Sequence, residues 1–206
     1  MKYLSLGLLL LLISCAKKEA VLLPKSDVTV ISDVEDHSPI YIFFRTKAMD
    51  TLVEVNRNNA IVSTNWILNI DKRLTLRVLV PAVMKLQEKK RNAVAHKNEA
   101  AQNYYSYADS IHKNMAFLLF TEVYYKLEKP KSGVVVYFDK NNEITVNDVV
   151  VKRSDLQHYL AHLPISFPNE FQFCFAKNMN YGSYIQNEIF VQSLKMTADK
   201  KEEFVY

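Results

Sequence analysis

Asp155, His158 and His162 have the spacing and the donor atoms of a metal site. Offsets of three and seven residues put all three side chains on one face of a helix. A histidine pair at four-residue spacing can bind zinc or copper, and a carboxylate can complete a set of three ligands. The alternative is that the carboxylate simply favours the dipole of the first helical turn while the histidines face solvent. We favour this alternative and predict neither a metal nor another cofactor.

Tyr104, Tyr105 and Tyr107 form an aromatic cluster in an otherwise polar, alanine-rich stretch, residues 92–112. Exposed tyrosines could stack on sugars or peptides, which makes the cluster a candidate binding site. Under this hypothesis the protein is an envelope hydrolase or a glycan-binding protein with its site in residues 92–130. Glycan hydrolysis also needs two carboxylates about 5 to 9 Å apart, and the sequence singles out no such pair. We favour the alternative that the tyrosines pack a loop onto the domain.

The composition argues against several other kinds of site. Glycine occurs only at positions 7, 133 and 182, which excludes glycine-rich phosphate loops and the nucleophile elbow. The 26 basic residues are interleaved with 22 acidic ones, so we predict no nucleic-acid partner. Cys174 lies in an apolar run and is expected to be a buried thiol, because a reactive cysteine needs an accessible, electropositive setting. These observations favour a protein that binds over one that catalyses.

The N-terminus indicates the compartment. A positively charged start, an apolar run over residues 4–13 and a small residue before a cysteine are typical of a signal peptide. The run is too short to span a bilayer, which takes about 20 apolar residues. The junction Leu12-Ile13-Ser14-Cys15 resembles the lipobox of bacterial lipoproteins. That resemblance implies cleavage before Cys15 and attachment there of acyl chains such as palmitate. Because Ala16 follows instead of Asp, it also implies an outer-membrane anchor facing the periplasm.

The rest of the chain predicts an α+β fold of two small sheet-plus-helix units. We expect a signal peptide at 1–14, a tether at 15–26, a first unit at 27–130 and a second at 131–206. In the first unit, apolar and aromatic runs predict strands at 28–31, 40–44, 52–55, 60–68, 115–120 and 121–127. Asn-rich residues 56–59 predict a hairpin turn between two of them. A helical period covers 73–91 with Pro81 inside it, and residues 92–112 are expected to be a loop or a loosely packed helix.

The second unit has the clearer pattern. Strands are predicted at 134–138, 143–151, 171–176 and 203–206, the last of them at a sheet edge. Helices are predicted at 154–163 and 180–194, the first with an apolar stripe and a serine cap. The order is therefore strand, strand, helix, strand, helix, strand.

This order resembles the periplasmic domain of the ExbD/TolR biopolymer-transport family. The local resemblance lies in residues 134–142 (VVVYFDKNN), 144–151 (ITVNDVVV), Asp155-Leu156 and 175–185 (FAKNMNYGSYI). Family members carry a transmembrane helix with an acidic residue for proton-driven work, which this chain lacks, and Lys177 stands where the family often has Asp. The resemblance thus implies a small fold for protein docking or for contacts near peptidoglycan, without proton coupling.

A faint internal repeat accompanies this pattern. Residues 53–61 (VEVNRNNAI) parallel residues 136–144 (VYFDKNNEI), and each segment is followed by Lys-Arg, at 72–73 and 152–153. Either residues 27–130 are a degenerate copy of the second unit, or strands that flank turns resemble one another by chance. We favour the second explanation.

Taken together, the sequence predicts a non-enzymatic, lipid-anchored periplasmic protein that binds another component of the cell envelope. The membrane, through the lipid anchor, and an envelope protein are its expected partners, with peptidoglycan as a further candidate. The family resemblance implies a connection to an energy-transduction or transport system of the TonB/ExbB/ExbD type.

Overall fold

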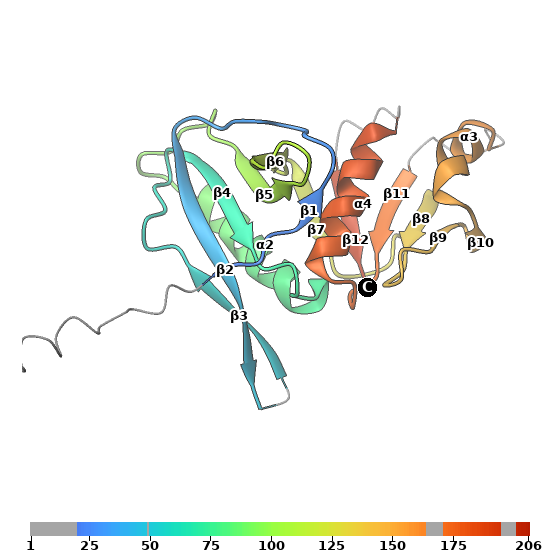
Figure 1. Ribbon diagram of the computed structural model, residues 1–206, viewed down its shortest axis with the longest axis horizontal. Coiled ribbons are helices and arrows are strands. Elements are labelled where there is room, and N and C mark those ends of the chain that lie inside the picture. Colours follow the sequence, from blue (N-terminus) through green and yellow to red (C-terminus); the bar gives the residue numbers. More distant parts are fainter. Residues whose placement is uncertain (1–19, 49, 164–170, 195–200) are drawn as a thin grey trace, which may run out of the picture.

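The fold is mixed α+β and is seen in a computed structural model that describes residues 20–48, 50–163, 171–194 and 201–206. The described residues form two six-stranded sheets and three α-helices (Figure 1). The predicted signal peptide and Cys15 lie outside them. Residues 20–26 of the predicted tether are part of the fold, because β1 (Lys25–Ser26) pairs with the end of β5 (Asn103–Asp109).

The first sheet has three parallel strands at its centre. They are β2 (His37–Lys47), β4 (Asn65–Ile70) and β5, and the helix α2 (Leu76–Arg91) connects the last two. β3 (Asp50–Asn56) pairs antiparallel with β2, and β6 (Met115–Leu119) pairs antiparallel with β5. The β2–β3 hairpin projects from the body of the molecule (Figure 1). Pro81 lies inside the continuous helix α2.

The second sheet has the order β10-β9-β8-β11-β12-β7. Its strands are β7 (Val123–Lys126), β8 (Val134–Phe138), β9 (Ile144–Val146), β10 (Val149–Val150), β11 (Phe171–Phe175) and β12 (Lys201–Val205). The short 3-10 turn η2 (Arg153–Asp155) and α3 (Leu156–Ala161) precede β11, and α4 (Tyr181–Ser193) connects β11 to β12. The element order predicted for residues 131–206 is thus present, with β10 added.

The two sheets share one topology. In the first, β2, β3, β4, α2 and β5 follow each other along the chain, and the strands are arranged β3-β2-β4-β5. In the second, β8, β9, β11, α4 and β12 are arranged in the same way, as β9-β8-β11-β12, with the same strand directions. In both sheets, the helix connects the last two parallel strands along the chain: α2 connects β4 to β5, and α4 connects β11 to β12. This match differs from the one suggested by the sequence pattern. The sequence pattern aligned β3 with β8, whereas the topology aligns β2 with β8.

The connections before α2 and α4 pair with each other. Thr75 and Asn180 are the N-cap residues of the two helices, have nearly the same backbone angles (φ −79° and −77°, ψ 149° and 153°) and form an antiparallel bridge. The N–H groups of Leu76 and Tyr181 donate to the carbonyls of Met179 and Leu74, at 2.9 and 2.7 Å. Because equivalent groups exchange these bonds, the two halves of the chain, residues 20–130 and 131–206, are related here by a local two-fold pseudosymmetry.

One large hydrophobic cluster joins the halves, and a chain of tyrosines runs through it. The hydroxyls of Tyr105 and Tyr125 lie 2.6 Å apart, and those of Tyr125 and Tyr184 lie 2.9 Å apart. Tyr184 then donates to Glu203 Oε2 at 2.6 Å. Burial raises the pKa of all three tyrosines, which keeps their hydroxyls protonated and able to donate. Apolar residues of both sheets surround this chain in one cluster.

A buried lysine fastens the end of α2 to the first sheet. Lys90 is 6% exposed, and its ammonium donates to the carbonyls of Thr64 and Gln102 and to Asn103 Oδ1 at 2.9–3.1 Å. Its Nζ also lies 5.0 Å from the centre of the Trp66 ring. Burial lowers the pKa of Lys90 from 10.5 to about 8, because loss of water disfavours the charged form.

Several predictions for residues 27–130 are wrong. Residues 103–109 form the inner strand β5, because the polar side chains that suggested a loop find partners inside; Ser106, for example, donates to Asn69 at 2.8 Å. β3 forms a hairpin with β2 and not with the following strand, which pairs on the other side of β2. The predicted strand at 28–31 is reduced to one bridge, between Ile31 and Phe117.

Two other features of the second half differ from the prediction: the place of β12 in the sheet and the boundary at 130/131. β12 was expected at a sheet edge, but it lies between β11 and β7. The second sheet includes β7, so it extends to the N-terminal side of the predicted boundary at 130/131. Residues on both sides of the predicted boundary thus contribute to the second sheet and to one large hydrophobic cluster.

Tyr184→Phe should destabilise the fold by about 1 to 3 kcal/mol, because it removes a buried hydroxyl that connects Tyr125 to the carboxylate of Glu203. Urea unfolding monitored by circular dichroism measures the change. Tyr41→Phe, at an exposed position, is the matched control and should change stability by less than about 0.5 kcal/mol. Equal effects of the two substitutions would contradict the role given to the tyrosine chain.

Lys90 predicts a pH dependence of stability. Since its pKa is lower in the folded than in the unfolded protein, the unfolded chain binds more protons between the two values, and stability rises with pH across this interval. The free energy of unfolding of the wild type relative to Lys90→Met should therefore increase by about 1 to 2 kcal/mol from about pH 8 to pH 10. Lys89→Met, at an exposed position of the same turn, should follow the wild type. A constant difference between wild type and Lys90→Met would contradict the argument.

Candidate functional site

The tyrosine cluster lies on the inner strand β5, and most of it is core. Tyr105 is stacked on Phe120 and belongs to the buried tyrosine chain. Tyr107 is fully buried, and its hydroxyl bonds to the backbone of Val28 and Val30 at 2.9 Å. Tyr104 faces the other side of the strand and is half-buried against a small apolar cluster. Tyr105 and Tyr107 therefore pack the core from a strand and not from the loop expected above, and both are too buried to stack on a sugar or peptide.

The candidate metal ligands converge only in part. The rings of His158 and His162 lie with their centres 4.1 Å apart, and His162 Nδ1 lies 2.8 Å from the carbonyl oxygen of His158. Asp155 Oδ1 accepts a hydrogen bond from Ser154. No group of three or more His, Cys, Asp or Glu side chains that could hold a metal ion occurs among the described residues. Helix α3 ends at Ala161, so it is too short to carry all three residues on one regular face.

Asp109 lies in a cluster with His112 and the hydroxyl of Thr29. The Asp109 carboxylate accepts from Thr29 Oγ1, contacts His112 Nδ1 at 2.7 Å and accepts from two backbone N–H groups of its own turn. Hydrogen bonds from Thr29 and then His112 hold the pKa of Asp109 well below its usual range. The Thr29 hydroxyl also lies 3.4 Å from His112 Nδ1, the same nitrogen that contacts the carboxylate, so the ring does not bridge the two groups as in a catalytic triad. This cluster closes the β5–β6 turn.

The remaining candidate nucleophile is the Cys174 thiol. Cys174 is fully buried in β11, and burial raises the pKa of its thiol to about 12. Since the thiolate is the nucleophilic form, this cysteine is unreactive at neutral pH. The prediction of a buried thiol is confirmed.

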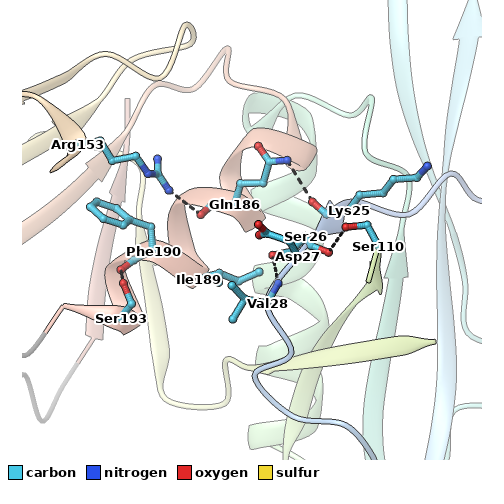
Figure 2. A pocket seen from close by; sticks show the side chains of 10 residues that line it. All are labelled: Lys25, Ser26, Asp27, Val28, Ser110, Arg153, Gln186, Ile189, Phe190 and Ser193. Carbon is cyan, nitrogen blue, oxygen red and sulfur yellow. Dashed lines mark hydrogen bonds between the residues drawn. The ribbon is translucent and has the colours of Figure 1, made fainter. Parts of the chain in front are cut away.

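A groove lies where the two halves meet, between β1 and α4 (Figure 2). We call it the junction groove; it has a volume of about 660 Å³. Its lining consists of Lys25, Ser26, Asp27, Val28 and Ser110 from the first half and Arg153, Gln186, Ile189, Phe190 and Ser193 from the second. The surface of the groove thus combines apolar side chains with three serines, two cations and one carboxylate.

Arg153 is the most firmly held cation of the groove. Its guanidinium donates to Asn187 Oδ1 at 2.7 Å and to the carbonyl of Gln186 at 3.0 Å, and it lies 4.0 Å from the centre of the Phe190 ring. Partial burial lowers the pKa of Arg153, although it remains a cation at neutral pH. A fixed guanidinium beside an aromatic ring suits a carboxylate attached to an apolar group.

Residues 25–28 form the wall of the groove opposite Arg153, and hydrogen bonds between side chains and backbone groups hold it in place. Gln186 Nε2 donates to the carbonyl of Lys25 at 3.1 Å, which connects α4 to β1 across the groove (Figure 2). Ser110 Oγ donates to the carbonyl of Ser26, and Ser26 Oγ accepts from the N–H of Val28. The segment 25–28 therefore has a defined conformation while the side chains of Lys25, Asp27 and Val28 stay exposed.

The lining residues of the groove can form binding contacts, but no catalytic arrangement occurs among them. None of its serines is bonded to a histidine or carboxylate base, and Asp27 is its only carboxylate. The sequence analysis missed this site, because its residues come from four separate segments, none of which has a local motif.

Within the described residues, no helix combines the length and the apolar character needed to cross a membrane. No protein-family model matches the chain, and no curated protein and no solved structure was found to match it.

Proposed function

We propose that this protein is a non-enzymatic, lipid-anchored protein of the bacterial periplasm that binds another envelope protein through the junction groove. The observation that carries the proposal is the groove itself, which both halves build from apolar, hydroxyl and cationic side chains. With Lys25 and Arg153 against Asp27, its charge favours an acidic partner segment. The apolar side chains Ile189 and Phe190 suit apolar residues beside the acidic ones.

The proposed address follows from Cys15 and its neighbours. Acylation at Cys15 would anchor the domain, and Ala16 favours the outer membrane. Peptidoglycan is then within reach as an additional contact. The alternative of a hydrolase or glycan-binding protein with its site in residues 92–130 loses its main support, because Tyr105 and Tyr107 are buried.

We further propose that each half derives from a unit of the ExbD/TolR type. The order of elements in the second half, the segment 175–185 and the topology shared with the first half support this proposal. The partner would then belong to a TonB/ExbB/ExbD-type assembly, with this chain contributing docking and not proton coupling.

Cys15→Ala should abolish lipid attachment and release the protein from the membrane fraction. Intact-mass spectrometry of purified protein and detergent phase partitioning measure both effects. Cys174→Ala is the matched control, since it removes the only other cysteine, a buried one, and should leave acylation unchanged. Retention of the acyl mass in Cys15→Ala would overturn the proposed anchor.

The groove is tested by a photoreactive amino acid placed in the full-length protein in cells. At Ser193, inside the groove, we expect one discrete crosslinked protein, and at the highly exposed Val94, outside it, none. Lys25→Glu combined with Arg153→Gln should reduce that crosslink at least about tenfold, because an acidic segment loses both cations. Thermal unfolding checks that the variant is folded. The same crosslink at Val94, or one that persists in the folded double variant, would contradict docking in the groove.

A further inference from the structure

The two paired connections at the pseudo-two-fold carry a group of cations. We call residues 71–77 and 176–182 the paired loops. The N–H of Arg77 donates to the carbonyl of Lys177 at 2.7 Å, and the N–H of Gly182 donates to the carbonyl of Lys72 at 3.0 Å. These bonds bring the backbones of three basic residues together on the paired loops. Arg77 and Lys177 are exposed there, and Lys72 is half-exposed.

The acidic residue of this area does not neutralise these three cations. Asp71 is the only acidic residue of the paired loops; it is buried and accepts two bonds from the Arg73 guanidinium at 2.7 and 2.9 Å. Arg73 in turn lies over the Phe44 ring. No salt bridge involves Lys72, Arg77 or Lys177 within the described part of the chain.

Helix dipoles add to the positive potential at the paired loops. Both α2 and α4 begin here, and neither has an acidic residue in its first turn. The N-terminal end of a helix carries a partial positive charge. Because the first N–H groups of both helices are already bonded to the opposite loop, an anion at this surface would be contacted by the basic side chains.

The N-terminal segment joins the body of the protein at this same area. The N–H of Lys72 donates to the carbonyl of Leu22 at 2.8 Å, and the N–H of Leu22 donates to the Asp71 carboxylate at 3.4 Å. Cys15 precedes Leu22 by seven residues, which span at most about 25 Å when fully extended. A lipid on Cys15 therefore keeps the paired loops within this distance of the membrane surface.

We propose that Lys72, Arg77 and Lys177 of the paired loops bind anionic phospholipid headgroups and so orient the protein on the membrane that anchors it. The orientation rests on the acylation of Cys15 proposed above, whereas the headgroup binding is a property of the folded surface. Each basic residue near an anionic membrane strengthens binding about fivefold. The three residues lie on two directly hydrogen-bonded loops and have exposed or half-exposed side chains, which suits several headgroups of a bilayer surface.

The test uses the mature full-length chain with Cys15→Ser, so that no acyl chain contributes to binding. Sedimentation with phosphatidylcholine vesicles and with mixed phosphatidylcholine–phosphatidylglycerol vesicles measures the partition coefficient. We expect binding to the mixed vesicles only, weakened by salt, which screens the charges. Lys72→Gln, Arg77→Gln and Lys177→Gln combined should reduce it between about tenfold and a hundredfold.

The control removes the same charge elsewhere, through Lys85→Gln, Lys89→Gln and Lys152→Gln, all at exposed positions. It should bind like the parent protein, with circular dichroism confirming the fold of both triple variants. Equal loss in the two variants would show attraction by net charge alone and overturn the proposal, as would inorganic phosphate at equal charge concentration displacing the protein completely. If Cys15 is not acylated in cells but the mixed vesicles still bind the paired loops, the anchor proposal fails while this one stands.

Discussion

The pairing of the two loops at Thr75 and Asn180 fixes how the halves of this protein are arranged. Each loop leaves the end of a central parallel strand and starts the helix that crosses to the next strand. The first N–H groups of a helix have no partner inside it and must find one elsewhere. Here each loop offers its carbonyls to the first N–H groups of the other helix, at 2.7 to 3.0 Å. Neither helix could begin as it does without the opposite half.

The buried tyrosine chain makes this arrangement specific. Apolar surfaces alone would tolerate small shifts between the sheets, whereas a chain of hydroxyls ending on Glu203 is satisfied in only one position. Tyr105 comes from the first sheet, Tyr125 and Glu203 from the second, and Tyr184 from the helix that crosses it. The interface is therefore polar at its centre: the Tyr105–Tyr125 contact joins the two sheets, and the Tyr125–Tyr184 contact joins residues 20–130 to residues 131–206.

The sequence predicted the second half well and the first half poorly, for physical reasons. Strands such as β8 and β11 consist of apolar residues between turn formers, and Asn180 caps α4 by accepting from the N–H of Ser183, so local patterns sufficed. β5 instead buries Ser106 and Asp109 with their hydrogen bonds satisfied, which no local pattern distinguishes from a loop. The junction groove could not be predicted at all, because distant segments create it. The tyrosines stand out in the sequence, but their burial depends on pairing between strands that are far apart in it.

The groove arises from a difference between two otherwise equivalent contacts. Each crossing helix meets the beginning of a strand in the other sheet. α2 is sealed against β7: Gln87 donates to the carbonyls of Phe120 and Val123, and Arg91 donates to those of Thr121 and Val123. α4 contacts β1 through Gln186, and its following turns stay apart from residues 25–28. The contact between α2 and β7 is thus closed, whereas the equivalent contact between α4 and β1 stays partly open. The open contact is the junction groove, where polar, charged and apolar side chains are available for binding.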